Sequence, residues 1–262
     1  MKKIITSTMI IIIVICLCFT STGCMDFLFS ALGLGSDESE NNKIVLQIHV
    51  NEETLSVNAY EDEQVTIEKL AIKQGYYLTG YFDAPEGGTK YFDSNGNSLS
   101  VWSKNNPTEF YAQWGDIDNY VLFENLVWSK NYYNFYSNTY FTILLNDGDE
   151  ISAIAGNLSR KIHLSINFKM SCPDFKTCDR SLYIVDDDTS AGEIYNKTYF
   201  TLNGSEYNTF SFEMDVSAKA FSKGTQNGKT VYRTHLKFNG SSVYPSYVKD
   251  LSVSAYFVPQ DI

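Results

Sequence analysis

Two clusters of carboxylates are the residues of this chain most able to do chemistry. They comprise Asp186, Asp187, Asp188 and Glu193 in one stretch, and Asp147, Asp149 and Glu150 in another. Acids gathered in loops most simply form a solvated surface. Because Ca2+ takes six to eight oxygen ligands, a structural calcium site at Asp186, Asp187 and Asp188 is the next interpretation. Catalysis by two carboxylates, as in glycoside hydrolysis, is the third interpretation and the least favoured.

Other familiar catalytic motifs are missing from the sequence. It has no Gly-x-Ser-x-Gly elbow, no His-Glu-x-x-His, no phosphate-binding loop and no dinucleotide fingerprint. His49, His163 and His235 are isolated from one another, so the sequence indicates neither a serine nucleophile with its base nor a four-ligand zinc site. We therefore expect a protein that is not an enzyme and has no cofactor beyond the calcium considered above.

Cysteine spacing predicts one disulfide. Cys16 and Cys18 lie in an apolar N-terminal stretch and Cys24 at its end, which leaves Cys172 and Cys178 for the folded part. In an oxidising compartment, a Cys-x5-Cys spacing most simply forms a local bridge. We predict a disulfide between Cys172 and Cys178.

Aromatic side chains are crowded into one short stretch. It contains Trp128, Tyr132, Tyr133, Phe135, Tyr136, Tyr140 and Phe141. Because a strand turns only alternate side chains inward, some of these rings must be exposed. Packing against the core or a neighbouring domain is the first interpretation of the crowding. The second is a ligand platform, since exposed Trp and Tyr suit sugars and protein interfaces; its candidate residues are Trp128, Tyr132, Tyr133 and Tyr136.

The N-terminus carries the pattern of an export signal. Two lysines precede an apolar run from Met9 to Phe19, and small residues follow it. Because the small residues end at Cys24, the segment resembles a bacterial lipoprotein signal, which implies cleavage after residue 23 and a lipid on the Cys24 thiol. An uncleaved anchor helix is an alternative, although the run is shorter than the roughly 20 residues that span a bilayer. Ordinary secretion is the other alternative.

The net charge argues against one class of partner. The whole chain carries −11, and loss of residues 1–23, which contain two lysines and no acid, brings it to −13. A field of that sign repels phosphate backbones. We expect no nucleic-acid partner.

The mature chain divides into a linker and two folded regions. Residues 24–43 combine an apolar tether with an acidic, aperiodic stretch, as in a lipidated tether and linker. Residues 44–114 begin with an alternating strand at Ile44–Val50, and a second extended stretch covers Thr54–Ala59. Gly87 and Gly88 suit a hairpin turn. We expect a first domain at 44–114 and a second at 115–262.

Ten residues of the first domain carry a family resemblance. They are Gly75, Tyr76, Gly80, Gly87, Gly88, Thr89, Tyr111, Ala112, Gln113 and Trp114. Their types and order resemble the Listeria–Bacteroides repeat, also called the internalin-type B-repeat, which reads Gly-Tyr-x-Phe-x-Gly-Trp-Tyr, Gly-Gly-Thr and Tyr-Ala-Gln-Trp. The resemblance implies a small β-grasp-like domain of bacterial surface proteins that serves as a spacer or adhesion module.

The second domain is predicted to be an antiparallel β-sandwich, because short alternating segments must bury one face against another sheet. The clearest segments are Tyr140–Leu145, Glu150–Ala155, Ile162–Phe168, Leu182–Ile184, Phe210–Val216, Tyr232–Phe238 and Leu251–Phe257. Phe200–Phe212 and Tyr247–Val253 resemble, weakly, a turn-and-strand run and the closing strand of jelly-roll carbohydrate-binding modules. The fold class expected for the whole chain is therefore mainly β, a β-grasp-like domain followed by a jelly-roll-like sandwich.

Together these features predict a non-catalytic lipoprotein on the bacterial cell envelope, at the outer membrane or cell surface. Its lipid anchor would hold it to the membrane. The leading hypothesis is adhesion or interaction with a host or cell-surface protein. The alternative is a glycan-binding surface lipoprotein whose sandwich acts like a carbohydrate-binding module.

Overall fold

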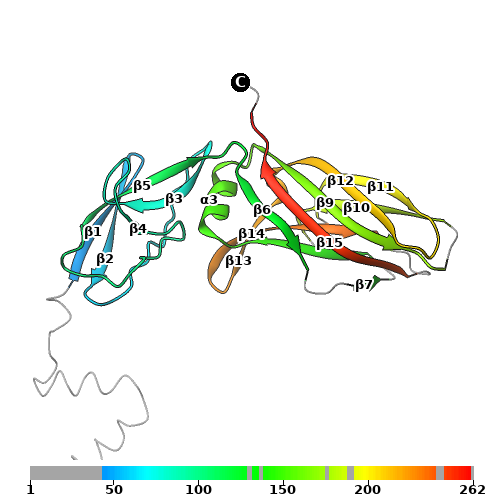
Figure 1. Cartoon of the computed structure of the whole chain (residues 1–262). Coiled ribbons are helices and arrows are strands. Elements are labelled where there is room, and N and C mark those ends of the chain that lie inside the picture. Colours follow the sequence, from blue (N-terminus) through cyan, green and yellow to red (C-terminus); the bar gives the residue numbers. More distant parts are fainter. Residues whose placement is uncertain are drawn as a thin grey trace, which may run out of the picture.

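The computed structural model describes residues 43–128, 132–135, 138–174, 177–187, 192–239 and 245–260. Strands dominate these residues, and two separate clusters of buried side chains form two cores. Figure 1 shows the corresponding two regions joined end to end, with one helix between them. The expected mainly β fold is confirmed.

The first region is a five-stranded sheet. Its strands are β1 (Lys43–Val50), β2 (Glu53–Tyr60), β3 (Tyr76–Phe82), β4 (Lys90–Phe92) and β5 (Glu109–Asp116). They lie in the order β2-β1-β5-β3-β4, in which the central pair β1 and β5 is parallel and the other pairs are antiparallel. This arrangement is the β-grasp-like sheet that was predicted.

The core of this small sheet depends on aromatic rings. Phe92 stacks on Trp102 with ring centroids 5.7 Å apart, and Phe110 meets both rings edge-on. Trp102 is fully buried, whereas Trp114 of β5 is only partly buried. A sheet of this size has few aliphatic residues to bury, so large rings supply much of its apolar area.

The described residues of the second region form ten strands, which are β6 (Val121–Val127), β7 (Tyr132–Phe135), β8 (Thr139–Leu145), β9 (Lys161–Ser171), β10 (Cys178–Val185), β11 (Ile194–Leu202), β12 (Asn208–Ser217), β13 (Ser222–Gln226), β14 (Lys229–Phe238) and β15 (Ser246–Phe257). A short 3-10 turn, η1 (Ala218–Ala220), precedes β13. All strand pairs are antiparallel.

The ten strands form two sheets. In one sheet β10 follows the edge strand β11, and β14 has β10 and β13 along one edge and β8 along the other. In the second sheet β9 follows the edge strand β12, and β15 has β9 along one edge and β6 and β7 along the other. The chain crosses repeatedly between the two sheets, as in a jelly roll.

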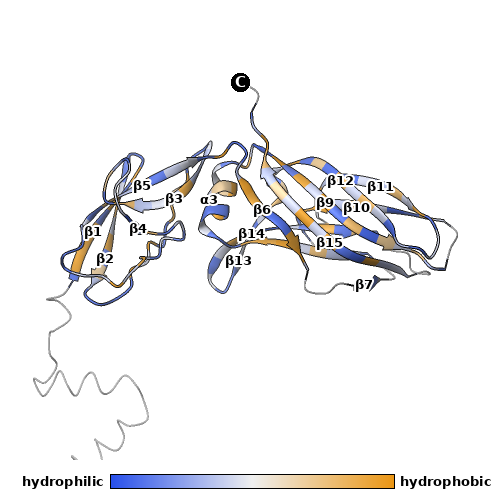
Figure 2. Cartoon of the chain, viewed as in Figure 1, coloured by the Kyte–Doolittle hydropathy of each residue, from blue (hydrophilic) through white to orange (hydrophobic). Residues whose placement is uncertain are grey.

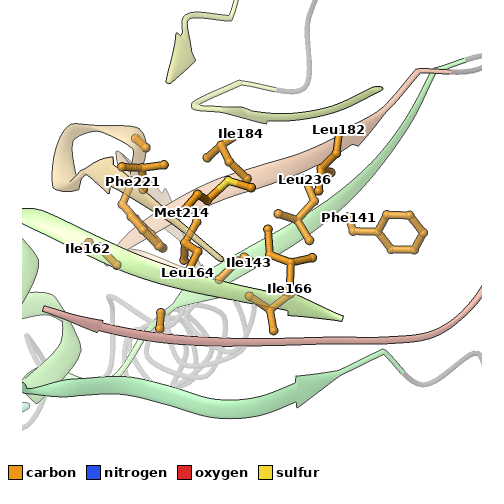
Figure 3. Close-up of a cluster of buried hydrophobic side chains, with 14 of the residues drawn as sticks. Phe141, Ile143, Ile162, Leu164, Ile166, Leu182, Ile184, Met214, Phe221 and Leu236 are labelled. Atoms are coloured by element: carbon orange, nitrogen blue, oxygen red, sulfur yellow. The ribbon is translucent and has the colours of Figure 1, made fainter. Parts of the chain in front are cut away.

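The two sheets share one core. Figure 3 shows Ile162, Leu164 and Ile166 of β9 facing residues of the other sheet, including Ile184 and Leu236. Hydropathy alternates along these strands, as Figure 2 shows for β9, β10 and β15. The period of two turns one set of side chains into the core and leaves the other set on an outer face.

One predicted strand is wrong. The segment Glu150–Ala155 lies in the helix α3 (Gly148–Gly156). Asp147 caps this helix by accepting a hydrogen bond from the Asp149 amide at 2.9 Å, and the Glu150 carboxylate accepts one from the Asp147 amide. The alternation of Ile and Ala imitates a strand, but a capping box nucleates a helix.

Helix α3 joins the two regions by completing an edge of β3. The Leu78 amide donates to Ser152 Oγ at 2.7 Å, and the Gly75 amide donates to Asn157 Oδ1 at 2.7 Å. β4 pairs with β3 only at Tyr81 and Phe82, so these side chains take the place of a strand along the first half of β3. A Cβ at Gly148 would overlap the Ser94 backbone, which shows how closely the helix approaches the first region.

Candidate binding face of the sandwich

A row of alternating tyrosines and lysines crosses the outer face of the β11-β10-β14-β8 sheet. The strand register places Lys197 of β11 opposite Tyr183 of β10, Tyr183 opposite Lys237 of β14, and Lys237 opposite Tyr140 of β8. Each of Tyr183, Lys237 and Tyr140 lies next to a buried core residue in its strand, so its own side chain points outward. Tyr199, two residues after Lys197, extends the row. We call these five residues the Tyr–Lys face.

The lysines of this face contact the faces of the tyrosine rings. The Lys197 ammonium lies 4.4 Å from the centre of the Tyr199 ring and 4.8 Å from that of Tyr183. The Lys237 ammonium lies 5.4 Å from the Tyr140 ring centre and 5.7 Å from that of Tyr183. Cation–π attraction therefore holds the five side chains in a fixed order. Tyr199 is 71% exposed, so much of its ring stays open to a ligand.

Local hydrogen bonds tune the titration of this face. Hydrogen bonds to Tyr199 and Tyr183 raise the pKa of Lys197 above its usual value, so the ammonium is charged at neutral pH. A hydrogen bond from Ser181, with others from Lys197 and Asn239, lowers the pKa of the Tyr183 phenol. The face thus presents fixed positive charge beside polarised phenol groups.

The lysines of this face differ in their partners from the lysines that form ion pairs, and Lys73 and Lys249 likewise lie over aromatic rings. Lys69, Lys104 and Lys169 each form an ion pair with a carboxylate. Within the described residues, no carboxylate lies within ion-pair distance of Lys197 or Lys237. Their partners are therefore neutral tyrosines, which leave the positive charge in place, in a chain with 31 acidic and 20 basic residues.

The outer face of the other sheet carries a charge cluster that is satisfied internally. His163 Nδ1 lies 2.8 Å from Asp215 Oδ1, and His163 Nε2 lies 2.9 Å from Glu213 Oε2. Ser165 donates a hydrogen bond to Glu213, and the His163 ring stacks on Tyr256 at 4.9 Å. Partial burial lowers the pKa of His163, but its hydrogen bonds to the carboxylates of Asp215 and Glu213 outweigh that effect and raise it. We call His163, Ser165, Glu213, Asp215 and Tyr256 the acid–His cluster.

The aromatic residues that the sequence singled out divide between described and undescribed parts of the chain. The rings of Trp128 and Tyr133 meet the buried Phe141 ring edge-on, at 5.6 and 4.7 Å, and both pack against the sandwich core. The Tyr132 side chain and Tyr136 lie outside the described residues. Of that crowded stretch, Tyr140 belongs to the Tyr–Lys face. The ligand role of the four candidates Trp128, Tyr132, Tyr133 and Tyr136 stays a prediction.

The predicted calcium site is only partly described. Asp186 accepts a hydrogen bond from the Glu193 amide at 2.8 Å, and Asp187 is described beside it, but Asp188 lies outside the described residues. In the part of the chain that the structure covers, no group of three or more His, Cys, Asp or Glu side chains is arranged to hold a metal ion. The calcium site therefore stays a prediction.

The acids of the second cluster have a structural explanation. Asp147 and Glu150 form the capping box of α3, and burial raises the pKa of Asp149 and of Glu150. Carboxylates near a helix N-terminus also interact favourably with its dipole. These residues stabilise the helix that joins the two regions.

The cysteine predictions have different outcomes. Cys172 and Cys178 form the predicted disulfide. Cys24 lies outside the described residues, so its lipidation stays a prediction. Across residues 43–260, as far as they are described, no helix is long and apolar enough to cross a membrane.

Two cavities among the described residues lie away from the Tyr–Lys face. One cavity of about 480 Å³ lies between the β1–β2 turn and residues 69–72, and another of about 350 Å³ lies beside Arg160 and Pro259. Neither is lined by a residue of the Tyr–Lys face. An open sheet face suits an extended ligand better than a small molecule, which is usually bound in a concave site.

Sequence reasoning missed most of this face because its residues come from four strands. Alternation alone shows that Tyr183 and Lys237 point away from the core. The register that sets Lys197, Tyr183, Lys237 and Tyr140 in one row is a property of the folded sheet. The signal in the sequence is limited to a lysine and a tyrosine two residues apart, at Lys197 and Tyr199.

No protein-family model matches this chain, and no curated protein matches it. Similar solved structures include one described as "CBM4 structure and function", with 14% identity, a TM-score of 0.27, and coverage of 44% of this chain and 60% of that one. "Structure of PfGH50B" has 15% identity and a TM-score of 0.25 over 55% of this chain and 23% of that one. The infectious bursal disease virus Gt strain structure has 7% identity and a TM-score of 0.29 over 83% and 65%. At these TM-scores the likenesses carry no argument about function.

Proposed function

We propose that this chain is a non-catalytic lipoprotein of the bacterial envelope whose sandwich binds a glycan through the Tyr–Lys face. The observation that carries the proposal is the row of Tyr140, Tyr183 and Tyr199 with two lysines between them. Tyrosine offers a flat apolar ring with a polar edge, which matches the alternating C–H and hydroxyl surfaces of a sugar. Lysine adds three N–H donors for sugar oxygens.

The proposed location comes from the export signal. A lipid on Cys24 would hold the protein to the membrane, with residues 24–43 as the linker and the folded regions beyond it. Lipid chains contribute about 0.8 kcal/mol for each buried methylene, so several chains give stable attachment. A binding protein held in this way meets ligands outside the cytoplasm, where glycans are abundant.

A second candidate function is adhesion to a cell-surface protein. The joint between the two regions favours it, because Ser152 and Asn157 of the α3 segment hydrogen-bond the backbone of β3. A joint made of buried hydrogen bonds resists bending, so the first region would act as a stiff spacer for the sandwich. Exposed tyrosines are common anchors of protein interfaces as well.

Binding measurements on the full chain in detergent micelles would test the glycan proposal. A glycan array identifies the ligand, and titrations of Tyr183→Ala and Tyr199→Ala measure the contribution of the face. We expect each variant to lose about 1–2 kcal/mol of binding free energy, a fall of about 5- to 30-fold in affinity. Tyr256→Ala is the matched control, because Tyr256 is an exposed tyrosine on the other sheet.

Two results would contradict the proposal. If the chain binds no glycan on the array but captures a purified surface protein through the same tyrosines, the adhesion candidate replaces it. If glycan binding is lost in Tyr256→Ala and kept in Tyr183→Ala, the ligand lies on the opposite face. Circular dichroism of each variant checks that the fold is retained.

A further inference from the structure

The lysines of the Tyr–Lys face indicate the chemical class of the glycan. We propose that the ligand is an acidic polysaccharide, whose sugars carry carboxylate or sulfate groups. This inference rests on the glycan-binding function proposed above and adds the charge of the ligand to it. We infer the negative charge of the ligand from the placement of Lys197 and Lys237, from their partners and from the electrostatic field around them.

The two lysines lie on either side of one tyrosine. Lys197 of β11 and Lys237 of β14 both pair with Tyr183 of the strand between them. Neighbouring strands are about 4.8 Å apart, so the two backbone positions are separated by about 9.6 Å. A sugar chain that lies across the strands over Tyr183 would therefore meet an ammonium group on each side.

Both ammonium groups keep donors for a ligand. Each has three N–H donors; the hydrogen bonds of Lys197 to Tyr199 and Tyr183 leave one of its donors for a ligand. Neither Lys197 nor Lys237 has a carboxylate within ion-pair distance in the described parts of the chain. Carboxylate or sulfate oxygens form short charge-assisted hydrogen bonds with ammonium, which are stronger than those of neutral hydroxyls.

The acids nearest this face are already occupied. Asp179 of β10 accepts a hydrogen bond from Thr201 at 2.7 Å, and Glu193 accepts one from Tyr195 at 3.1 Å. A hydrogen bond from a hydroxyl leaves a carboxylate negative, so the positive charge of this face is confined to the two ammonium groups, on a chain of net charge −11. The surrounding negative field repels anions elsewhere, so an acidic ligand would be confined to this face.

Single-stranded nucleic acid is the other polymer that aromatic and cationic side chains bind. Proteins that bind it combine stacking rings with a positive groove that follows the backbone over several nucleotides. Two lysines on an open sheet of an acidic protein do not supply such a groove. An acidic polysaccharide, whose anionic groups stand among many hydroxyls, fits the tyrosine hydroxyls and the two ammonium groups better.

The test uses the full chain in detergent micelles and matched ligands. The probes are polygalacturonate, alginate and heparin, each beside a counterpart whose carboxylates are esterified or whose sulfates are removed. We expect binding to at least one acidic probe, at least about fivefold weaker binding to its neutralised counterpart, and weaker binding as salt rises. A single-stranded oligonucleotide is included as a competing polymer.

Lysine variants test whether binding of the acidic probe depends on the Tyr–Lys face. The double variant K197Q/K237Q should bind the acidic probe at least about fivefold more weakly than the natural chain. K169Q/K249Q is the control, because it removes the same charge from two lysines that pair on the opposite sheet, one of them beside a tyrosine ring. The control should bind as the natural chain does.

Each outcome decides the inference. Equal binding to acidic and neutralised probes, with loss only in Tyr183→Ala, overturns the acidic ligand and leaves glycan binding intact. Stronger binding to the oligonucleotide, or equal losses in the two double variants, overturns the inference as well. If no probe and no arrayed glycan binds, the proposed function fails together with it.

Discussion

The two outer faces of the sandwich are built by the same rule and differ in how their charges are balanced. Both consist of the side chains that alternate with one shared core. On one face His163 is bonded to Asp215 and Glu213, and Lys169 pairs with Asp250 at 2.9 Å. On the other face Lys197 and Lys237 contact tyrosine rings. The acid–His cluster is bonded internally, although Lys249 on the same face lies over the Tyr207 ring. On the second face both Lys197 and Lys237 lack an ion-pair partner within the described residues.

This difference shows why exposure or aromatic content alone does not identify a binding surface. Tyr256 on the acid–His cluster is 37% exposed, but its ring is stacked on a histidine that two carboxylates hold. Tyr199 is more exposed, and its cationic neighbour has no carboxylate partner in the described residues. The useful criterion is therefore which charged groups the fold leaves without a charged partner.

The largest expected effect comes from a substitution in the core, which supports both outer faces of the sandwich. Phe168 of β9 is buried, and its ring lies 5.0 Å from Phe238 and 5.6 Å from Phe200 of the other sheet. Phe168→Ala should lower the free energy of unfolding by about 3–5 kcal/mol, because it leaves a cavity between the sheets. Urea denaturation measures the change. A loss below about 1 kcal/mol would show that the two sheets are not coupled through this ring.

A smaller effect is expected from a substitution at the α3 joint, which should leave both outer faces of the sandwich unchanged. Asn157 is fully buried, accepts from the Gly75 amide, and donates to the carbonyls of Tyr76 and Ala153. Asn157→Ala leaves these groups without partners and should cost about 2–3 kcal/mol. Hydrogen exchange should show faster exchange of the Gly75 amide, with the strands of both faces unchanged. Faster exchange in β10 and β14 instead would mean that the joint supports the binding face.

The next prediction concerns pH and affects only the acid–His cluster. The pKa of His163 is raised in the folded protein, so its contribution to stability is fully present below the unfolded value of about 6.5. It is lost as pH rises through the folded pKa, because the imidazolium that bonds to Glu213 and Asp215 is then deprotonated. The difference in Tm between the natural chain and His163→Gln should therefore shrink from pH 5 towards pH 8. A difference that grows with pH would contradict the assignment.

The smallest expected effect compares lysines on the two faces. Lys197→Gln removes exposed cation–π contacts, and Lys169→Gln removes a surface ion pair; each should change the free energy of unfolding by less than about 1 kcal/mol. Chemical denaturation of both variants measures this. A large loss in Lys197→Gln would mean that the Tyr–Lys row stabilises the fold, and its role in binding would then need another explanation.

The sequence predicts the individual strands of this fold better than it predicts which elements pair or pack with one another. Period-two alternation locates β1, β9, β14 and β15, and Cys-x5-Cys predicts the disulfide. The helix α3 is missed, although Asp147 and Glu150 stand at capping-box spacing, because Ile151 and Ala153 alternate with smaller polar or apolar residues as in a strand. Local pattern cannot decide between the two structures where tertiary packing selects one.

The candidate binding face lies beyond what local patterns can show. Tyr140 and Lys237 are almost a hundred residues apart in the chain and become neighbours only through the pairing of β8 with β14. The crowded aromatic stretch directed attention to Trp128 and Tyr133, whose rings pack on Phe141. Register depends on which faces are buried, and this is decided by the whole sandwich.

The most direct test of the central claim observes lysines on both faces during one titration. In the full chain with 13C-dimethylated lysines, NMR signals of Lys197, Lys237, Lys169 and Lys249 can be assigned by single substitutions. Addition of the best-bound polysaccharide should shift the signals of Lys197 and Lys237 in a saturable manner and leave those of Lys169 and Lys249 in place. Shifts confined to Lys169 and Lys249, or equal shifts on both faces, would contradict the account.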